Sequence, residues 1–108
     1  MVVQISLFLE TFGDTPLLRV LEFFLMYPDF DYTKSYVAKE TGVSRVTIEE
    51  IWKHLVKVNI ITESRTLGKI EMWRLNKEHP KVKVLMQTVV RLSLSYLESL
   101  KAKAKTTS

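Results

Sequence analysis

Cysteine is absent from the 108-residue chain. Its absence excludes disulfides, thiolate chemistry and zinc sites built on cysteine, and favours an intracellular protein. No apolar run reaches the roughly 18 residues that a membrane-spanning helix requires, so we expect no membrane association. The N-terminal stretch MVVQISLFLE lacks a basic flank and a small-residue cleavage site, so we expect no signal peptide.

Signatures of catalysis are equally scarce. The chain has two histidines, His54 and His79, and neither has a second ligand at metal-binding spacing. It has no glycine-rich phosphate loop and no Ser/His/Asp grouping at recognisable offsets. We therefore predict that the protein is not an enzyme and holds neither a metal nor a cofactor. His79 is expected to cap a helix, and Trp52 and Trp73 to serve packing rather than to line a ligand pocket.

Positive charge is unevenly distributed along the chain. The net charge is +4, but residues 1–30 carry −3, whereas residues 76–108 carry +5 from seven basic and two acidic residues. A pI near 9.4 suits a polyanionic partner without establishing one.

Punctuating residues divide the chain into helices. Residues 2–12 fit both a strand and a helix, and we favour a short helix that ends at Gly13. Asp14 or Thr15 caps the next helix, which has Pro16 at its first position and stops at Pro28. Thr33 caps a short helix that ends near Glu40, and Ser44 caps a third that ends near Val58.

A β-hairpin and a long helix complete the chain. The runs IITESR and KIEMWRL have high strand propensity and are separated by a turn at TLG, where Gly68 supplies the turn residue. His79 and Pro80 open a helix over about 80–100, and the basic tail 101–108 is expected to be frayed. This order predicts a single mainly α domain with a small β-hairpin (α+β), a winged helix-turn-helix, over 1–108, with its core in 14–75.

The stretch AKETGVSRVTIEEIWKHL has the spacing of a helix-turn-helix. Ala38 is small where two helices cross, and Gly42 accepts a left-handed turn. Val43 fills the turn, and Ile48 and Ile51 point back at the first helix. The apolar face of the second helix holds Ile48, Ile51, Leu55 and Val58; the opposite face holds Arg45, Val46, Glu49, Glu50, Lys53 and Lys57.

Segment 33–75 resembles the winged-helix DNA-binding domains of small archaeal and bacterial transcriptional regulators of the ArsR-like and MarR-like kind. The resemblance rests on that stretch, on IIT in the first hairpin strand and on MWRLN in the second. It implies a cytoplasmic, nucleoid-associated protein that binds double-stranded DNA sequence-dependently and as a dimer; a repressor is favoured over an activator, and the sequence does not decide between them. In such domains the second helix enters the major groove and the hairpin touches the neighbouring backbone or minor groove.

Site residues follow from the resemblance, position by position. In the first turn of the second helix, Ser44, Arg45, Val46 and Thr47 are candidates for base and phosphate contacts. Candidate phosphate contacts are Lys34, Lys39, Lys53 and Lys57 on the two helices, and Arg65, Lys69 and Arg74 in the hairpin. His54 is expected to be a surface or phosphate contact.

Glu49 and Glu50 depart from the pattern because phosphates repel carboxylates. One of them, such as Glu50, could accept a hydrogen bond from cytosine N4. We favour pairing with basic neighbours instead, with Glu49 and Lys53 at the favoured i, i+4 spacing.

The last helix carries a heptad-like seam formed by Val82, Leu85, Val89, Leu92 and Tyr96. The seam fits either packing on the first helix of the same chain or, as we favour, a homodimer. A dimer would place two reading helices roughly 34–36 Å apart on a palindromic site. The alternative function is a winged helix used for protein–protein contact in a transcription, replication or segregation complex. The sequence names no effector.

Overall fold

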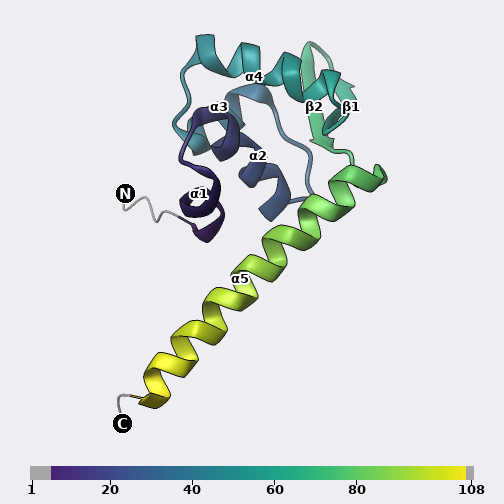
Figure 1. Cartoon of the computed structure of the whole chain (residues 1–108). Helices are drawn as coiled ribbons and strands as arrows, with labels where there is room; N and C mark the ends of the chain where they lie inside the picture. Colours follow the sequence, from purple (N-terminus) through teal and green to yellow (C-terminus); the bar gives the residue numbers. More distant parts are fainter. Residues whose placement is uncertain (1–5, 107–108) are drawn as a thin grey trace.

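The computed structural model describes the backbone of residues 6–106 and the side chains of residues 6–102. Along this range the chain forms α1 (Leu7–Phe12), α2 (Pro16–Met26), α3 (Lys34–Thr41), α4 (Arg45–Lys57), β1 (Ile61–Leu67), β2 (Ile70–Leu75) and α5 (Pro80–Thr106) (Figure 1). The predicted order of helices and hairpin is confirmed. The fold is a winged helix-turn-helix followed by a long helix, as the fold class predicted.

Hydroxyl side chains fix the starts of the first four helices. Ser6, Thr15, Thr33 and Ser44 each accept a hydrogen bond from the backbone N–H three residues further on, which satisfies a donor that the helix itself leaves unpaired. The predicted caps at Thr33 and Ser44 are confirmed, and Thr15 rather than Asp14 caps α2. The predicted N-terminal helix is present from Leu7 to Phe12; residues 2–5 of that prediction lie outside the described range.

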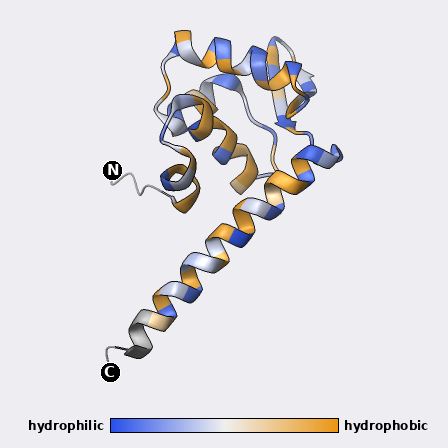
Figure 2. Ribbon diagram, viewed as in Figure 1, coloured by the Kyte–Doolittle hydropathy of each residue, from blue (hydrophilic) through white to orange (hydrophobic). Residues whose placement is uncertain are grey.

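Helix α2 lies at the centre of the domain. Its Val20, Phe24 and Leu25 are buried, and it contacts α1, α3, α4, α5 and β2. Figure 2 shows α2 as hydrophobic over most of its length, whereas α4 alternates between hydrophobic and hydrophilic residues. Phe8 and Leu9 of α1 join the same core. The buried core therefore extends beyond residues 14–75 and includes both flanking helices.

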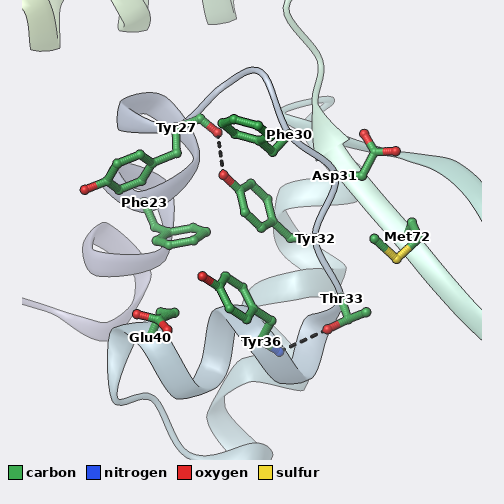
Figure 3. Close-up of a pocket in the computed structure, with 9 residues that line it drawn as sticks. All are labelled: Phe23, Tyr27, Phe30, Asp31, Tyr32, Thr33, Tyr36, Glu40 and Met72. Carbon is green, nitrogen blue, oxygen red and sulfur yellow. Dashed lines mark hydrogen bonds between the residues drawn. The ribbon is translucent and has the colours of Figure 1, made fainter.

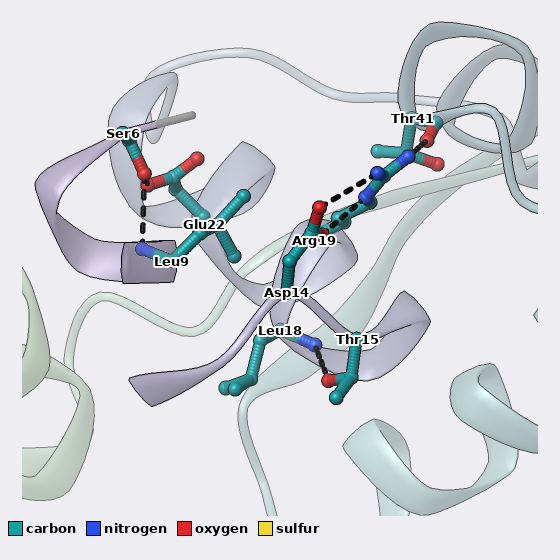
Figure 4. Close-up of polar contacts among 8 residues, drawn as sticks. All are labelled: Ser6, Leu9, Asp14, Thr15, Leu18, Arg19, Glu22 and Thr41. Atoms are coloured by element: carbon teal, nitrogen blue, oxygen red, sulfur yellow. Dashed lines mark hydrogen bonds and ion pairs between the residues drawn. The ribbon is translucent and has the colours of Figure 1, made fainter. Parts of the chain in front are cut away.

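The turn between α3 and α4 is built on Gly42. Its φ of 71° is left-handed, and its N–H and that of Val43 both donate to the carbonyl of Ala38. Val43 is buried, as predicted. Arg19 of α2 donates to the Thr41 carbonyl at 3.5 Å and ties the central helix to this turn (Figure 4).

The same Arg19 guanidinium holds Asp14. Two hydrogen bonds join the side chains, at 2.5 Å from Nε and 2.8 Å from Nη2. The hydrogen bond from Arg19 lowers the pKa of the Asp14 carboxyl below its usual value. Asp14 therefore orients Arg19 toward the turn instead of capping α2.

The hairpin is antiparallel and shorter in its turn than predicted. Its strands pair from Ile61 with Leu75 at the buried base to Leu67 with Ile70 at the exposed tip. The turn consists of Gly68 and Lys69, so the prediction that Thr66 and Leu67 belong to the turn is wrong: both residues continue the ladder. A register shift between Glu63 and Arg65 adds one unpaired residue to β1.

Helix α5 differs from the prediction in length. It begins at Pro80, where His79 Nδ1 accepts the Lys81 N–H at 3.1 Å, so the predicted capping role of His79 is confirmed. It continues to Thr106, past the predicted end near Leu100 and through most of the tail that was expected to be frayed. Lys and Ala residues fill this extension, and both favour helix.

The apolar seam of α5 is divided between two environments. Val82 and Val89 are buried in the domain's own core, and Leu85 and Leu92 pack against it. The prediction that these residues form a dimer interface is therefore corrected for Val82 and Val89, whose side chains have no surface left for a second chain. Tyr96 is 51% exposed on the part of α5 that projects from the domain (Figure 1). Among the described helices none is long and apolar enough to cross a bilayer.

The left-handed turn predicts the effect of a methyl group at position 42. An added Cβ would meet nothing closer than Arg19 Nη1 at 3.9 Å, so Gly42→Ala introduces backbone strain without a steric clash. We expect a loss of about 1 kcal/mol in the free energy of unfolding, measured by urea denaturation. Gly42→Asn is the control and should lose less, because asparagine tolerates this conformation. A Gly42→Ala variant more stable than the parent protein would contradict a left-handed conformation at residue 42.

Candidate nucleic-acid interface

The orientation of α4 is set by its buried side. Ile48, Ile51 and Leu55 are buried as predicted, and Val58, just beyond the helix, packs against the core. Trp52 is also buried: its ring lies 5.6 Å from that of Phe24 in α2 and 5.9 Å from that of Trp73 in β2, between ring centroids. The two tryptophans thus serve packing, and the other face of α4 is directed away from the core.

The first turn of α4 is exposed. Arg45 and Val46 are accessible, and Val46 is 80% exposed although its side chain is apolar. The Ser44 hydroxyl accepts the Thr47 N–H at 3.3 Å and donates to the Thr47 hydroxyl at 3.0 Å. No acidic residue lies in this turn, so the positive end of the helix dipole is not neutralised by its own sequence.

A hollow of about 710 Å³ between α3 and α4 brings predicted residues together. Lys34, Lys39, Ser44 and Arg45 all line it. Ser35 lines it as well and was missed by sequence reasoning. Its position next to Lys34 at the start of α3, where a hydroxyl can meet an anion, was the available signal.

Both acidic residues of α4 are paired, though not as predicted. Glu49 accepts from Lys34 of α3 at 3.0 Å, and Glu50 lies 3.8 Å from Lys53. The predicted pair of Glu49 with Lys53 is therefore wrong, because Lys34 reaches Glu49 across the helix-turn-helix. Lys34 Nζ also lies 6.0 Å from the centroid of the Trp52 ring, which further fixes its side chain.

The predicted basic residues of the hairpin differ in whether they form ion pairs. Arg65 lies 3.2 Å from Asp31, and Arg74 lies 3.5 Å from Glu78, so both of these predicted contacts are held by the protein itself. Lys69 lies in the hairpin turn. Among the side chains that the structure describes, four predicted cations make no ion pair: Lys39, Arg45, Lys57 and Lys69.

Two other predicted features can be placed. His54 is exposed in the last turn of α4. Within residues 6–102 no group of three or more histidine, aspartate or glutamate side chains is arranged to hold a metal ion. The surface is therefore one of separate cations and hydroxyls around the start of α4, with α3 on one side and the hairpin beyond its other end (Figure 1).

Comparison with known proteins places the chain by fold. No protein-family model and no curated protein matches it. A possible transcriptional regulator from Methanosarcina mazei superposes with a TM-score of 0.54 at 18% sequence identity, over 92% of this chain and 83% of that one. Lactococcus lactis ZitR, solved in complex with DNA, superposes with a TM-score of 0.57 at 22% identity, over 83% of this chain and 64% of ZitR. At such identities the likeness is one of fold.

The cap of α4 predicts how much its first turn depends on one hydroxyl. Ser44→Ala removes the acceptor for the Thr47 N–H, and we expect the free energy of unfolding to fall by about 1 kcal/mol. Ser95→Ala, on the exposed part of α5, is the control and should change stability by less than about 0.5 kcal/mol. Urea denaturation measures both variants. Equal stability of Ser44→Ala and the parent protein would show that another group caps α4.

Proposed function

We propose that the protein binds double-stranded DNA in a sequence-dependent manner, as a homodimer, and regulates transcription in the cytoplasm. One observation carries the proposal: the first turn of α4 is exposed, capped by a hydroxyl and free of acidic residues, and its Arg45 makes no ion pair with any described side chain. A helix start of this kind suits insertion into the major groove, where a helix fits and base edges are distinct.

Each residue of the turn has a matching chemistry. The Arg45 guanidinium can donate two hydrogen bonds to guanine O6 and N7, or bind a phosphate. Val46 exposes an apolar side chain that costs free energy in water and finds a partner in the thymine methyl group. The hydroxyls of Ser44 and Thr47 lie at the helix N-terminus, where anions are favoured.

Three further cations supply phosphate contacts. Lys39, Lys57 and Lys69 are unpaired in the described part of the chain and come from α3, the end of α4 and the hairpin turn. Glu49 and Glu50 offset part of this attraction, since each neutralises a lysine that would otherwise meet DNA. Lys34 and Lys53 therefore contribute less than sequence reasoning assigned to them. We therefore expect a single protomer to bind DNA weakly, and a second protomer in a dimer to raise the overall affinity.

The projecting part of α5 supplies the dimer surface in this proposal. Val90, Leu94 and Leu97 follow one another at spacings of four and three residues, and each is more than half exposed. Leu100 extends the same apolar surface, whereas Tyr96, seven residues after Val89, lies on the side of the helix that carries Val89. The part of α5 that projects from the domain has no packing partner in its own chain, and helices gain most of their stability from packing. Its apolar stripe becomes buried when two such helices pair. The interface thus lies C-terminal to the buried Val82 and Val89.

Pairing through α5 gives the complex two reading helices. A two-fold axis predicts a palindromic site whose halves are roughly 34–36 Å apart, one turn of DNA or a multiple of it. Occupation of such a site within a promoter excludes polymerase, so repression is the favoured outcome. The two structures of similar fold support this direction, since one is described as a possible transcriptional regulator and the other was solved with DNA.

A second candidate function is a protein–protein contact module. The paired acidic residues on α4 and the exposed apolar surface of α5 favour it. The two functions differ in salt dependence. DNA binding should weaken with a slope of several units in log K against log salt. Fluorescence anisotropy with genomic fragments measures this, and an absence of binding at roughly 50 mM salt favours the protein-contact function.

The exposed position of Arg45 predicts the effect of its substitution on DNA binding. Arg45→Ala should weaken binding to the preferred site by about 1–3 kcal/mol and reduce discrimination between sites, if the side chain reads a base. Arg91→Ala is the matched control: it removes the same charge from an exposed position on α5, away from α4. Anisotropy titrations against preferred and scrambled duplexes measure both. An equal effect of the two variants would contradict a reading role for Arg45.

The apolar stripe on α5 predicts a homodimer that a single substitution should disrupt. The parent protein should sediment at twice the monomer mass of 12.6 kDa. Leu97→Glu places a carboxylate in the proposed interface and should yield the monomer, whereas Ser95→Glu adds the same charge to the opposite side of α5 and should remain dimeric. Analytical ultracentrifugation at micromolar concentration decides between them. A parent protein at 12.6 kDa would refute the dimer.

A further inference from the structure

An open pocket of about 690 Å³ lies away from the first turn of α4. It is bounded by the end of α2, the loop at residues 27–33, one face of α3 and Met72 of β2 (Figure 3). Ligand pockets in proteins are commonly between about 300 and 1,000 Å³, so the space suits a small organic molecule.

Aromatic rings form most of the pocket. The ring centroid of Phe23 lies 4.9 Å from that of Tyr32, 5.5 Å from that of Tyr27 and 6.2 Å from that of Tyr36. Phe30 closes another side (Figure 3). Three of these side chains are strongly exposed: Tyr27 by 54%, Phe30 by 65% and Tyr36 by 47%. Exposed rings gathered around one hollow mark a binding site more often than a packing fault.

The pocket carries acidic groups. Among the described residues that line it, Asp31 and Glu40 are acidic and none is a lysine, arginine or histidine. Asp31 is paired with Arg65 at 3.2 Å, but Glu40 has no ion pair among the described side chains. Tyr36 and Glu40 are one turn apart on α3, so the ring and the carboxylate share a face. The Tyr32 hydroxyl donates to the Tyr27 carbonyl at 3.0 Å, and burial raises its pKa, so this hydroxyl stays neutral.

Aromatic ring faces and an unpaired carboxylate both attract cations. The face of an aromatic ring carries negative potential and attracts cations, most strongly when several rings surround the charge. An anion such as a phosphate is repelled by Glu40. We propose that this aromatic pocket binds a bulky organic cation and that its occupancy changes the affinity of the protein for DNA; the second statement rests on the proposed function.

The route from the pocket to the DNA-binding surface is short. The Tyr32 N–H donates to the Trp73 carbonyl at 2.7 Å, and the Trp73 N–H donates to the Tyr32 carbonyl at 2.8 Å. The pocket loop is thereby joined to the hairpin strand β2, and Trp73 contacts Trp52 of α4. A ligand against Tyr32 and Tyr36 touches both the hairpin attachment and α3, which together set the relative positions of α4 and the hairpin turn.

The first experiment measures binding without DNA. Isothermal titration and the NMR resonances of the aromatic rings are followed with benzyltrimethylammonium, benzyl alcohol and benzoate, which present a positive, a neutral and a negative group on one aromatic ring. We expect affinity to fall in that order, with the cation bound at least about threefold more tightly than the alcohol. Equal affinities, or the tightest binding by benzoate, would overturn the proposal.

Variants locate the site. Tyr36→Leu and Glu40→Gln should each weaken binding of benzyltrimethylammonium by about threefold or more. Phe12→Leu and Glu10→Gln are the matched controls, since they alter an exposed ring and an exposed carboxylate on α1 outside the pocket. Circular dichroism confirms that each variant folds. Loss of affinity in the α1 controls as large as that in the pocket variants would place the site elsewhere and refute the assignment.

The second experiment repeats the DNA titration with and without saturating benzyltrimethylammonium, at constant ionic strength. A change in DNA affinity of threefold or more that disappears in Glu40→Gln supports the coupling. Ligand binding with unchanged DNA affinity would refute the coupling and leave the cation site intact. Ligand binding by a protein that does not bind DNA would refute the proposed function alone.

Discussion

The position of Trp52 is the constraint on which the rest of the structure depends. Its ring is buried between Phe24 of the central helix and Trp73 of the hairpin, with centroids 5.6 and 5.9 Å away. Burial of so large a ring contributes several kcal/mol, of the order of 3–5 kcal/mol by truncation of comparable residues. It fixes α4 about its own axis and against the hairpin at once. Because the buried Trp52 fixes the rotation of α4, the first turn of this helix lies exposed on the surface.

Intramolecular pairing then decides which charges face solvent freely. Lys34, Arg65 and Arg74 are similar in sequence as basic residues, and each meets a carboxylate outside its own helix or strand: Glu49 of α4, Asp31 of the loop before α3 and Glu78 of the connection after β2. Exposed pairs of this kind contribute little to stability, typically less than about 1 kcal/mol. Their larger effect is on the surface potential: of the cations predicted to contact DNA, Lys39, Arg45, Lys57 and Lys69 are the ones that make no ion pair among the described side chains. The acidic pair on α4 belongs to this arrangement and does not exclude an anionic partner.

The loop at residues 27–33 joins two features that are separate in sequence. Tyr32 pairs by backbone with Trp73, and its side chain lies among the rings of the aromatic pocket. Six of the eleven aromatic residues fall between positions 23 and 36, a density that was visible in the sequence. Periodicity explained Phe24 as core but gave no reason for Tyr27, Phe30 and Tyr36 to be exposed together. Only the fold shows that they surround a single hollow.

Local patterns were sufficient for the elements of this protein. The hydroxyl caps, the left-handed Gly42 and the apolar face of α4 act over a few residues, so the sequence alone determined the helix-turn-helix, the hairpin and the exposed first turn of α4. The pairing of Glu49 with Lys34 and of Arg65 with Asp31 depends on side chains far apart in the chain. So does the fate of the α5 seam, where Val82 and Val89 enter the core and Leu94 and Leu97 do not. An apolar stripe is the same in sequence whether it meets its own domain or solvent, and the point at which α5 leaves the domain is decided only by tertiary packing.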